Sequence, residues 1–211
     1  MLKLNGLIIE WLGHSGFKVK GEKVLYIDPY QCDAHEKADI ILITHSHYDH
    51  CSIADVKRIS TSSTIVVGTP ACQSKLNYER VVMKDFKIVR PGMKLNVLGI
   101  GIEAIPSYNL NKKFHQKSEE NVGYVISLNG KRIYHAGDTD KIPEMANLKN
   151  IDVAMLPVGG TYTMDAREAA EAADIIKPGI VVPMHYGKAV GSLQDAQTFK
   201  KLCKQKVELL G

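Results

Sequence analysis

The feature that most constrains this chain is the segment Thr44–His50, which carries three histidines and an aspartate directly after the apolar run Ile40–Ile43. Polar side chains that are buried each need a partner. Four ligand-type side chains in so short a span are hard to explain by packing, whereas divalent cations would satisfy all of them together. The segment therefore predicts a metal site at the end of a buried strand.

The spacing within this segment indicates two adjacent metal positions. If the chain stays extended after a strand over 39–44, His45 and His47 point the same way. Asp49 and His50 follow as the chain turns, so they can face a neighbouring point. Imidazole with carboxylate suits Zn²⁺, and Mn²⁺, Fe²⁺, Ni²⁺ and Co²⁺ accept the same ligands. The competing interpretation is a polar loop with coincidental histidines.

Length and composition predict one domain, residues 1–211. The 211 residues are 45% hydrophobic, enough for one sizeable core. The net charge of +4 is mild, and no basic stripe indicates nucleic acid. No signal peptide or membrane-length apolar run is evident, and the four cysteines have no paired spacing. We therefore expect a cytoplasmic protein with reduced thiols and no membrane partner.

Apolar periodicity and turn residues predict a β-rich first third followed by alternating strands and helices. Strands are expected over 7–12, 17–20, 24–27, 39–44, 64–67, 81–83, 87–89, 95–98, 102–105, 122–128, 131–135, 152–156, 180–183 and 207–210. Helices are expected over 52–60, 70–76, 165–176 and 192–203. Residues 106–121 look like a long loop of the kind that is usually functional or disordered. The rhythm is similar in each half and suits two packed mixed sheets with helices outside.

Two further polar groups follow predicted strands. Asp138 comes just after Gly137, and it either caps a coming helix or serves as a carboxylate between two metals. His185 follows an apolar strand and precedes Gly187, and it is either structural or a ligand. The nearby motif at Thr44–His50 favours the ligand interpretation for both.

The remaining histidines leave alternatives open. His14 lies in a turn, where it can donate to substrate, form a hydrogen bond to a ligand or simply satisfy polar groups of the loop. His115 is the only histidine between His50 and His135, and a first site with three histidines needs it unless His14 or His135 turns inward. His35 lies in a polar stretch and is expected to be solvated.

The stretch Gly159–Asp165 combines a glycine pair with hydroxyl groups at a helix start. It predicts either an anion site for a phosphate or carboxylate of the substrate, or plain helix capping by Thr163 or Asp165.

With these motifs in view, the chain resembles hydrolases of the metallo-β-lactamase superfamily, for which the Thr44–His50 motif is the hallmark. Segments 11–14, 27–29, 135–140 and 183–187 resemble a narrower branch. That branch holds ascorbate-phosphate-lactonase-like proteins and many predicted metal-dependent hydrolases, and it is related to a phospholipase D acting on N-acyl-phosphatidylethanolamine. The resemblance implies an α/β fold, a four-layer αββα sandwich of two mixed β-sheets with helices on both outer faces.

The resemblance also implies a ligand assignment. His45 and His47 would hold the first metal, His50 and His185 with Asp49 the second, and Asp138 would bridge the two. Family members usually supply a further histidine at a strand end where this chain has 106–109. His115 or Asn109 would then complete the first site, or that site is weak.

We therefore expect a metal-dependent hydrolase that uses a metal-bound hydroxide to cleave an ester, lactone or phosphodiester of a small cytosolic substrate. Two Zn²⁺ per chain would lie about 3.5–4 Å apart. Asp49 and His14 are the expected catalytic residues, and the substrate can be phosphorylated or otherwise anionic. The expected substrate-binding residues are Tyr108, Asn109, Tyr162 and Thr163. A homo-oligomer is compatible with the sequence. The alternative is a non-catalytic metal-binding regulatory module with incomplete ligation of the first site.

Overall fold

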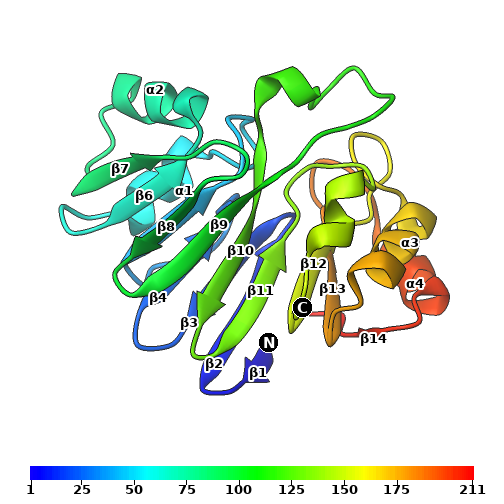
Figure 1. Ribbon diagram of the computed structural model, residues 1–211. Coiled ribbons are helices and arrows are strands. Elements are labelled where there is room, and N and C mark those ends of the chain that lie inside the picture. The colour runs from blue at the N-terminus through cyan, green and yellow to red at the C-terminus, as the bar shows by residue number, and fades with distance from the viewer. The chain divides into compact units, whose positions relative to one another are not determined.

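The computed structural model describes all 211 residues, which divide into two compact units: residues 1–89 with 210–211, and residues 90–209. Each unit contains one seven-stranded mixed sheet and two α-helices (Figure 1). The predicted fold class, two mixed sheets with accompanying helices and a similar rhythm in each half, is confirmed.

The sheet of the first unit runs in chain order from β1 to β7. Its strands are β1 (Leu2–Leu4), β2 (Leu7–Gly13), β3 (Gly16–Lys20), β4 (Val24–Ile27), β5 (Ile40–Ile43), β6 (Ile65–Gly68) and β7 (Asp85–Ile88). Strands β1 to β4 pair antiparallel, and β4 to β7 pair parallel. Strand β5 is buried along its whole length, as the apolar run predicts for a strand inside a sheet.

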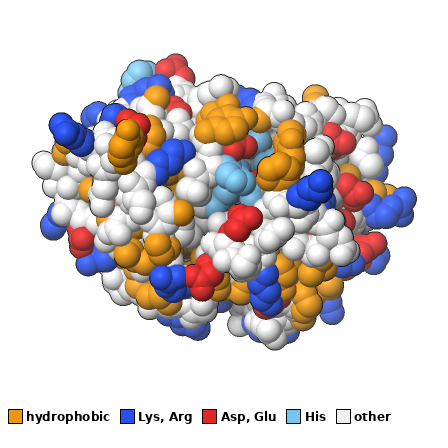
Figure 2. Space-filling view, turned by 90° about the horizontal axis from the view of Figure 1, so that it is seen from above, with side chains coloured by type: hydrophobic (Ala, Val, Ile, Leu, Met, Phe, Trp, Pro, Cys, Tyr) orange, Lys and Arg blue, Asp and Glu red, His pale blue; other side chains and the backbone are white.

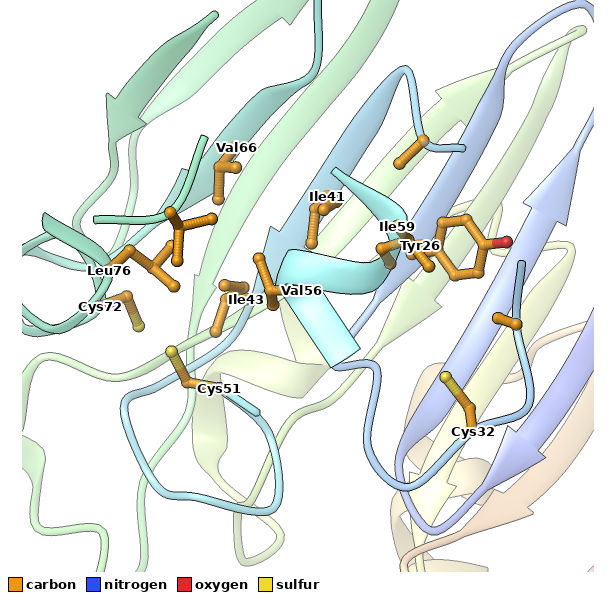
Figure 3. Packing of buried hydrophobic residues seen from close by; sticks show 13 residues of the cluster. Tyr26, Cys32, Ile41, Ile43, Cys51, Val56, Ile59, Val66, Cys72 and Leu76 are labelled. Carbon is orange, nitrogen blue, oxygen red and sulfur yellow. The ribbon is translucent and has the colours of Figure 1, made fainter. Parts of the chain in front are cut away.

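Helix α1 (Ile53–Ile59) covers the parallel strands of this sheet. The chain enters the helix through Ser52, whose Oγ accepts a hydrogen bond from Asp55 N. Val56 and Ile59 of α1 are fully buried and pack in one cluster with Ile41 and Ile43 of β5 (Figure 3). Helix α2 (Pro70–Tyr78) adds Cys72 and Leu76 to the same cluster. Burial of each large aliphatic side chain stabilises the fold by about 1.5–3 kcal/mol, so this cluster anchors the strand that leads into the histidine motif.

The sheet of the second unit has the order β14-β13-β12-β11-β10-β9-β8. Its strands are β8 (Lys94–Val97), β9 (Ile100–Pro106), β10 (Val122–Leu128), β11 (Lys131–His135), β12 (Val153–Pro157), β13 (Ile180–Met184) and β14 (Lys206–Val207). Strands β8 to β11 pair antiparallel, and β11 to β14 pair parallel. Asn129-Gly130, a pair that suits a tight turn, joins β10 to β11 in a hairpin.

Helices α3 (Ala166–Ile176) and α4 (Leu193–Leu202) lie side by side and contact β12 and β13 respectively (Figure 1). The buried face of α3 is made of alanines and Ile176. Asp165 caps this helix by accepting from Arg167 N and Glu168 N. Two 3₁₀ helices, η1 (Lys117–Glu119) and η2 (Pro143–Asn147), complete the unit.

Most predicted elements are present within one or two residues of their expected bounds, but the strand expected over 81–83 is wrong. Val81 N donates to Leu76 O and so closes the end of α2, and Lys84 N donates to Thr64 O only where β7 is about to begin. Val81 and Met83 of this segment pack against the core without sheet pairing, whereas Val82 is exposed. Strand β14 is shorter than expected, and β1, η1 and η2 were not predicted.

The cysteines, the helix lengths and the surface charges bear on the expectations from composition. All four cysteines are free thiols, as predicted. No helix is both long and apolar enough to cross a membrane. Lysine and arginine side chains are scattered over the face shown in Figure 2 and form no continuous stripe there.

Candidate metal centre

The histidine motif of the first unit begins where β5 ends. Cys51 N donates to His47 O at 2.8 Å, and this turn closes the segment after His47. His45 and His47, two residues apart, have ring centroids 4.7 Å apart, and His45 Nε2 lies 3.1 Å from His47 Nδ1. His50 returns beside them, with its ring centroid 4.1 Å from that of His45. The motif therefore gathers its three imidazoles.

A second group in this unit forms around Asp49. His14, in the turn between β2 and β3, places Nε2 3.0 Å from Asp49 Oδ2. The ligand atoms of His14, Asp49 and His50 all lie within 4.8 Å of one another. His14 and His50 are fully buried, whereas the Asp49 side chain keeps 14% of its surface exposed. We call His14, His45, His47, Asp49 and His50 the first ligand set.

Asp28 supports this set from behind, a role that our sequence analysis missed. Its carboxylate accepts from Thr44 N at 2.8 Å and from Thr44 Oγ1 at 2.6 Å. It also lies 2.7 Å from His50 Nδ1. A carboxylate on Nδ1 fixes the imidazole tautomer and leaves Nε2 as the ligand atom. The signal in the sequence was an aspartate directly after a buried strand and before Pro29.

The second unit gathers a smaller group around Asp138, which follows β11. His185, after β13, places Nε2 3.1 Å from Asp138 Oδ2. His115, from the long loop, places Nε2 3.5 Å from the same oxygen. All three side chains are 3% exposed or less. We call His115, Asp138 and His185 the second ligand set.

Several of these residues have left-handed backbone conformations. The φ angles are 52° at His14, 43° at Asp28, 57° at His115 and 60° at His185. Such angles are uncommon outside glycine, and they cluster where function requires a particular side-chain direction. The segment after β12 comes close to His185, since a Cβ on Gly159 would lie 2.4 Å from His185 O. Glycine at 159 is therefore required by packing.

The loop over 106–121 is held against the Asp138 turn by many hydrogen bonds. Thr139 Oγ1 donates to Tyr108 O at 2.9 Å, and Asp140 N donates to the same oxygen. Asn109 N donates to His115 O at 2.7 Å, and Asn109 Nδ2 donates to Phe114 O and Tyr162 O. Asn109 thus braces the loop that carries His115, and only its Oδ1 lacks a hydrogen bond.

A second tie joins this loop to η2. Tyr108 Oη donates to Glu144 at 2.9 Å, and Lys117 Nζ lies 3.1 Å from the other oxygen of that carboxylate. Burial opposes ionisation of Glu144, but hydrogen bonds from its own backbone, Tyr108 and Lys117 outweigh it and lower the pKa of Glu144. Burial, followed by the bond to Glu144, raises the pKa of Tyr108, so its hydroxyl stays protonated.

The expected substrate-binding residues differ in their exposure to solvent. Tyr162 is 36% exposed, and its ring stacks edge-to-face on Phe114 with centroids 5.2 Å apart. Thr163 is fully buried, and its hydroxyl donates to Met164 O. At the start of α3, Asp165 supplies the cap, which is the plain-capping alternative of our sequence analysis.

The other two histidines belong to neither ligand set. His135 is fully buried in β11, where its Nδ1 accepts from Gly137 N. His35 is largely exposed and pairs with Asp33, as expected for a solvated residue. Histidine surface is sparse on the face shown in Figure 2, where small pale-blue patches border acidic and hydrophobic side chains.

The spacing of the ligand atoms fits a bound metal ion. Two ligands about 2.1 Å from a tetrahedral zinc lie about 3.4 Å apart. In the first set, His45 Nε2 and His47 Nδ1 lie 3.1 Å apart. The separations within the second set are 3.1 Å and 3.5 Å. Nitrogen with carboxylate oxygen is also the donor chemistry that zinc and its neighbours prefer.

Comparisons with known proteins identify the family. The family model described as "Beta-lactamase superfamily domain" matches residues 8–185. The chain therefore belongs to the β-lactamase superfamily.

Individual relatives narrow this assignment. A UPF0173 metal-dependent hydrolase of Thermococcus kodakarensis is 34% identical, over 96% of this chain and 94% of the relative. Among solved structures, a candidate metal-dependent hydrolase from Parabacteroides distasonis is 32% identical with a TM-score of 0.85, covering 96% of this chain and 92% of that one. A metallo hydrolase of Ignicoccus hospitalis is 25% identical with a TM-score of 0.77, covering 97% and 94%. These similarities span both units.

The role of Asp28 leads to a testable prediction. Asp28→Asn keeps the size of the side chain and tolerates a positive φ, but it removes the negative charge behind His50. We expect metal affinity to fall about 10–100-fold, measured by competition with a chromophoric chelator. Asp33→Asn, at an exposed aspartate, is the matched control and should leave the affinity unchanged. Equal affinities for the two variants would contradict the assigned role.

The tie at Glu144 predicts a pH effect. Its lowered folded pKa means that it stabilises the loop at neutral pH, and this contribution disappears as the pH falls through that value. At pH 7, Glu144→Gln should speed amide hydrogen exchange in residues 106–121 by about two- to fivefold. The difference from wild type should vanish well below about pH 4. Glu171→Gln, which alters another partly exposed ion pair, is the control. A difference that persists in acid would contradict the electrostatic explanation.

Proposed function

We propose that this protein is a hydrolase that depends on a divalent metal and cleaves an ester, lactone or phosphodiester of a small substrate. The observation that carries the proposal is the first ligand set. The motif turn gathers three imidazoles and a carboxylate, His14 contacts that carboxylate, and Asp28 lies behind His50. Membership of a family whose relatives are named metal-dependent hydrolases supports the same conclusion.

The metal ligands are assigned from both sets. His45 and His47 would hold a first ion together with His115, and Asp49, His50 and His185 would hold a second. Asp138 serves both, because its carboxylate lies beside His115 and His185. The donor chemistry favours zinc, two ions per chain, with Mn²⁺, Fe²⁺ and Ni²⁺ as substitutes. The resemblance of the motifs to the superfamily supports the assignment of the two sets to one dinuclear centre.

When bound, the ions supply Lewis acidity toward a carbonyl or phosphoryl oxygen and make water a stronger acid. The chain's own residues provide the orientation. Asp49 is the most exposed carboxylate of the two sets and lies 3.0 Å from His14. It can accept a hydrogen bond from the attacking water and so direct the water's lone pair at the substrate. The His14 imidazole holds the Asp49 carboxylate in place, and Trp11 Nε1 donates to the backbone oxygen of His14 and so supports the turn that carries it.

Tyr162 is the best placed of the expected substrate contacts, because its ring is partly exposed next to Phe114 and its carbonyl holds Asn109 and His115. Tyr108 and Thr163 are buried, with their hydroxyls already bonded within the protein. We therefore assign them to the support of the loop and of the turn before α3.

A non-catalytic metal-binding module is the second candidate function. The first ligand set favours turnover over this alternative, because Asp49 is backed by a histidine yet keeps access to solvent. A regulatory protein would bind metal and hydrolyse no member of a panel of esters, lactones and phosphodiesters.

Two variants test the proposal. Asp49→Ala should reduce kcat on any true substrate by at least about 100-fold with the melting temperature of the metal-free protein unchanged. His115→Ala should weaken metal retention by about 10–100-fold. His35→Ala, at an exposed histidine, is the control and should change neither quantity. Wild-type turnover in Asp49→Ala would rule out the mechanism, and full metal retention in His115→Ala would remove His115 from the ligand set.

A further inference from the structure

A hollow on the first unit lies beside the histidine motif and belongs to neither ligand set. Its volume is about 660 Å³, and its walls come from the loop after β4, the motif turn and helices α1 and α2. Tyr48 and Cys51, which line it, flank the Asp49–His50 pair in the chain. Pockets for small molecules commonly have volumes of about 300–1,000 Å³, so the hollow has the right size for a substrate group.

The charge of the hollow favours an anion. Its charged lining residues are Asp55, Arg58 and Lys75. The Asp55 carboxylate is already bonded within the protein: it accepts from Ser52 Oγ at 2.5 Å, from Arg58 Nη1 at 2.9 Å and from two backbone N–H groups. Its charge is thus offset by Arg58, and the charge of Lys75 is left without a counter-ion in the lining.

Lys75 has donors to spare. Its ammonium group gives one hydrogen bond, to Ser46 O at 3.0 Å, and a lysine has three donors. That bond also fixes the ammonium group beside the loop between His45 and His47. A ligand anion in the hollow would therefore receive a charge-assisted hydrogen bond from a group that is already positioned.

The hollow also has an aromatic wall. The rings of Tyr30 and Tyr48 pack edge-to-face with centroids 5.8 Å apart. Tyr48 is 64% exposed, so most of its ring is available to a ligand. Tyr30 also contacts His14, with ring centroids 5.7 Å apart, which links this wall to the Asp49 partner. A flat apolar group would be held by these rings.

We propose that this hollow, the basic groove lined by Tyr30, Tyr48, Arg58 and Lys75, binds the anionic end of the substrate. The ligand is a phosphate or carboxylate joined to a flat apolar group: the anion is bonded by Lys75 and the flat group packs on Tyr48. This inference rests on the proposed function, because it assigns the groove to the substrate of that hydrolase.

The test is a calorimetric titration with phenylphosphonate, which has the required anion and ring but no ester bond to cleave. The as-purified protein and the chelator-treated protein are both titrated, which separates binding in the groove from binding to metal. Lys75→Met should raise Kd about tenfold, and Lys75→Arg should restore most of the affinity. Lys57→Met removes the same charge from neighbouring α1, where the lysine pairs with Glu79 outside the groove, and should leave Kd unchanged.

A second pair of variants tests the aromatic wall. Tyr48→Ala should weaken phenylphosphonate binding about fivefold without changing the binding of inorganic phosphate. Tyr78→Ala, at a tyrosine that is 86% exposed and lies outside the groove, should have no effect. Because Tyr48 is exposed, its variant should fold even if Lys75→Met does not.

The outcomes distinguish the groove from the proposed function. Equal Kd values for Lys75→Met and Lys57→Met, or the absence of saturable binding, would contradict the proposal that the groove binds an anion. If esters are hydrolysed while Lys75→Met and Tyr48→Ala change neither Kd nor KM, the proposed role of the groove is wrong and the proposed hydrolase activity is retained. If phenylphosphonate binds through Lys75 and Tyr48 but nothing on the substrate panel is hydrolysed, the ligand chemistry of the groove stands and the hydrolase fails.

Discussion

The buried carboxylate of Asp28 is the interaction on which the rest of the first unit's site depends. It lies at the end of β4, fully buried, and it accepts both the backbone and the side-chain hydrogen bond of Thr44 at the end of β5. Its remaining bond holds His50. A buried charge without such partners would be strongly destabilising. The same three bonds that satisfy Asp28 therefore fix where β5 stops, where the motif turns and which nitrogen His50 presents.

The second unit also contains a buried carboxylate that contacts histidines, but its residues come from other elements. A carboxylate, Asp138, follows a buried strand and is flanked by two histidines whose backbones are left-handed. Parallel strands end at a common edge, so polar residues that follow them come together without being close in sequence. His115 comes instead from a loop, and that loop is held in place by Asn109 and by the tie from Tyr108 and Lys117 to Glu144. Ligand geometry in this unit thus depends on loop order as well as on the sheet.

Much of this was predictable from the sequence, because apolar periodicity reports burial and the motif at Thr44–His50 concentrates ligands after a buried strand. The strand expected over 81–83 was wrong, since apolar residues that pack without pairing look the same in the sequence. The support of His50 by Asp28 and the tie of Lys117 to Glu144 join residues far apart in the chain, so no local pattern encodes them. The placement of His115 beside Asp138 was suggested only by the absence of another histidine in that region.

The central claim is that both ligand sets hold metal. The most direct test is an anomalous difference map from crystals grown with zinc, recorded on both sides of the zinc absorption edge. The proposed assignment predicts two strong peaks. One should lie within about 2.3 Å of ligand atoms of His45 and His47, the other within that distance of ligand atoms of Asp49, His50 and His185, and Asp138 should contact both. His115 should be close to the first peak. Peaks only at exposed groups such as His35, or peaks that contact neither Asp138 nor the motif histidines, would contradict the account.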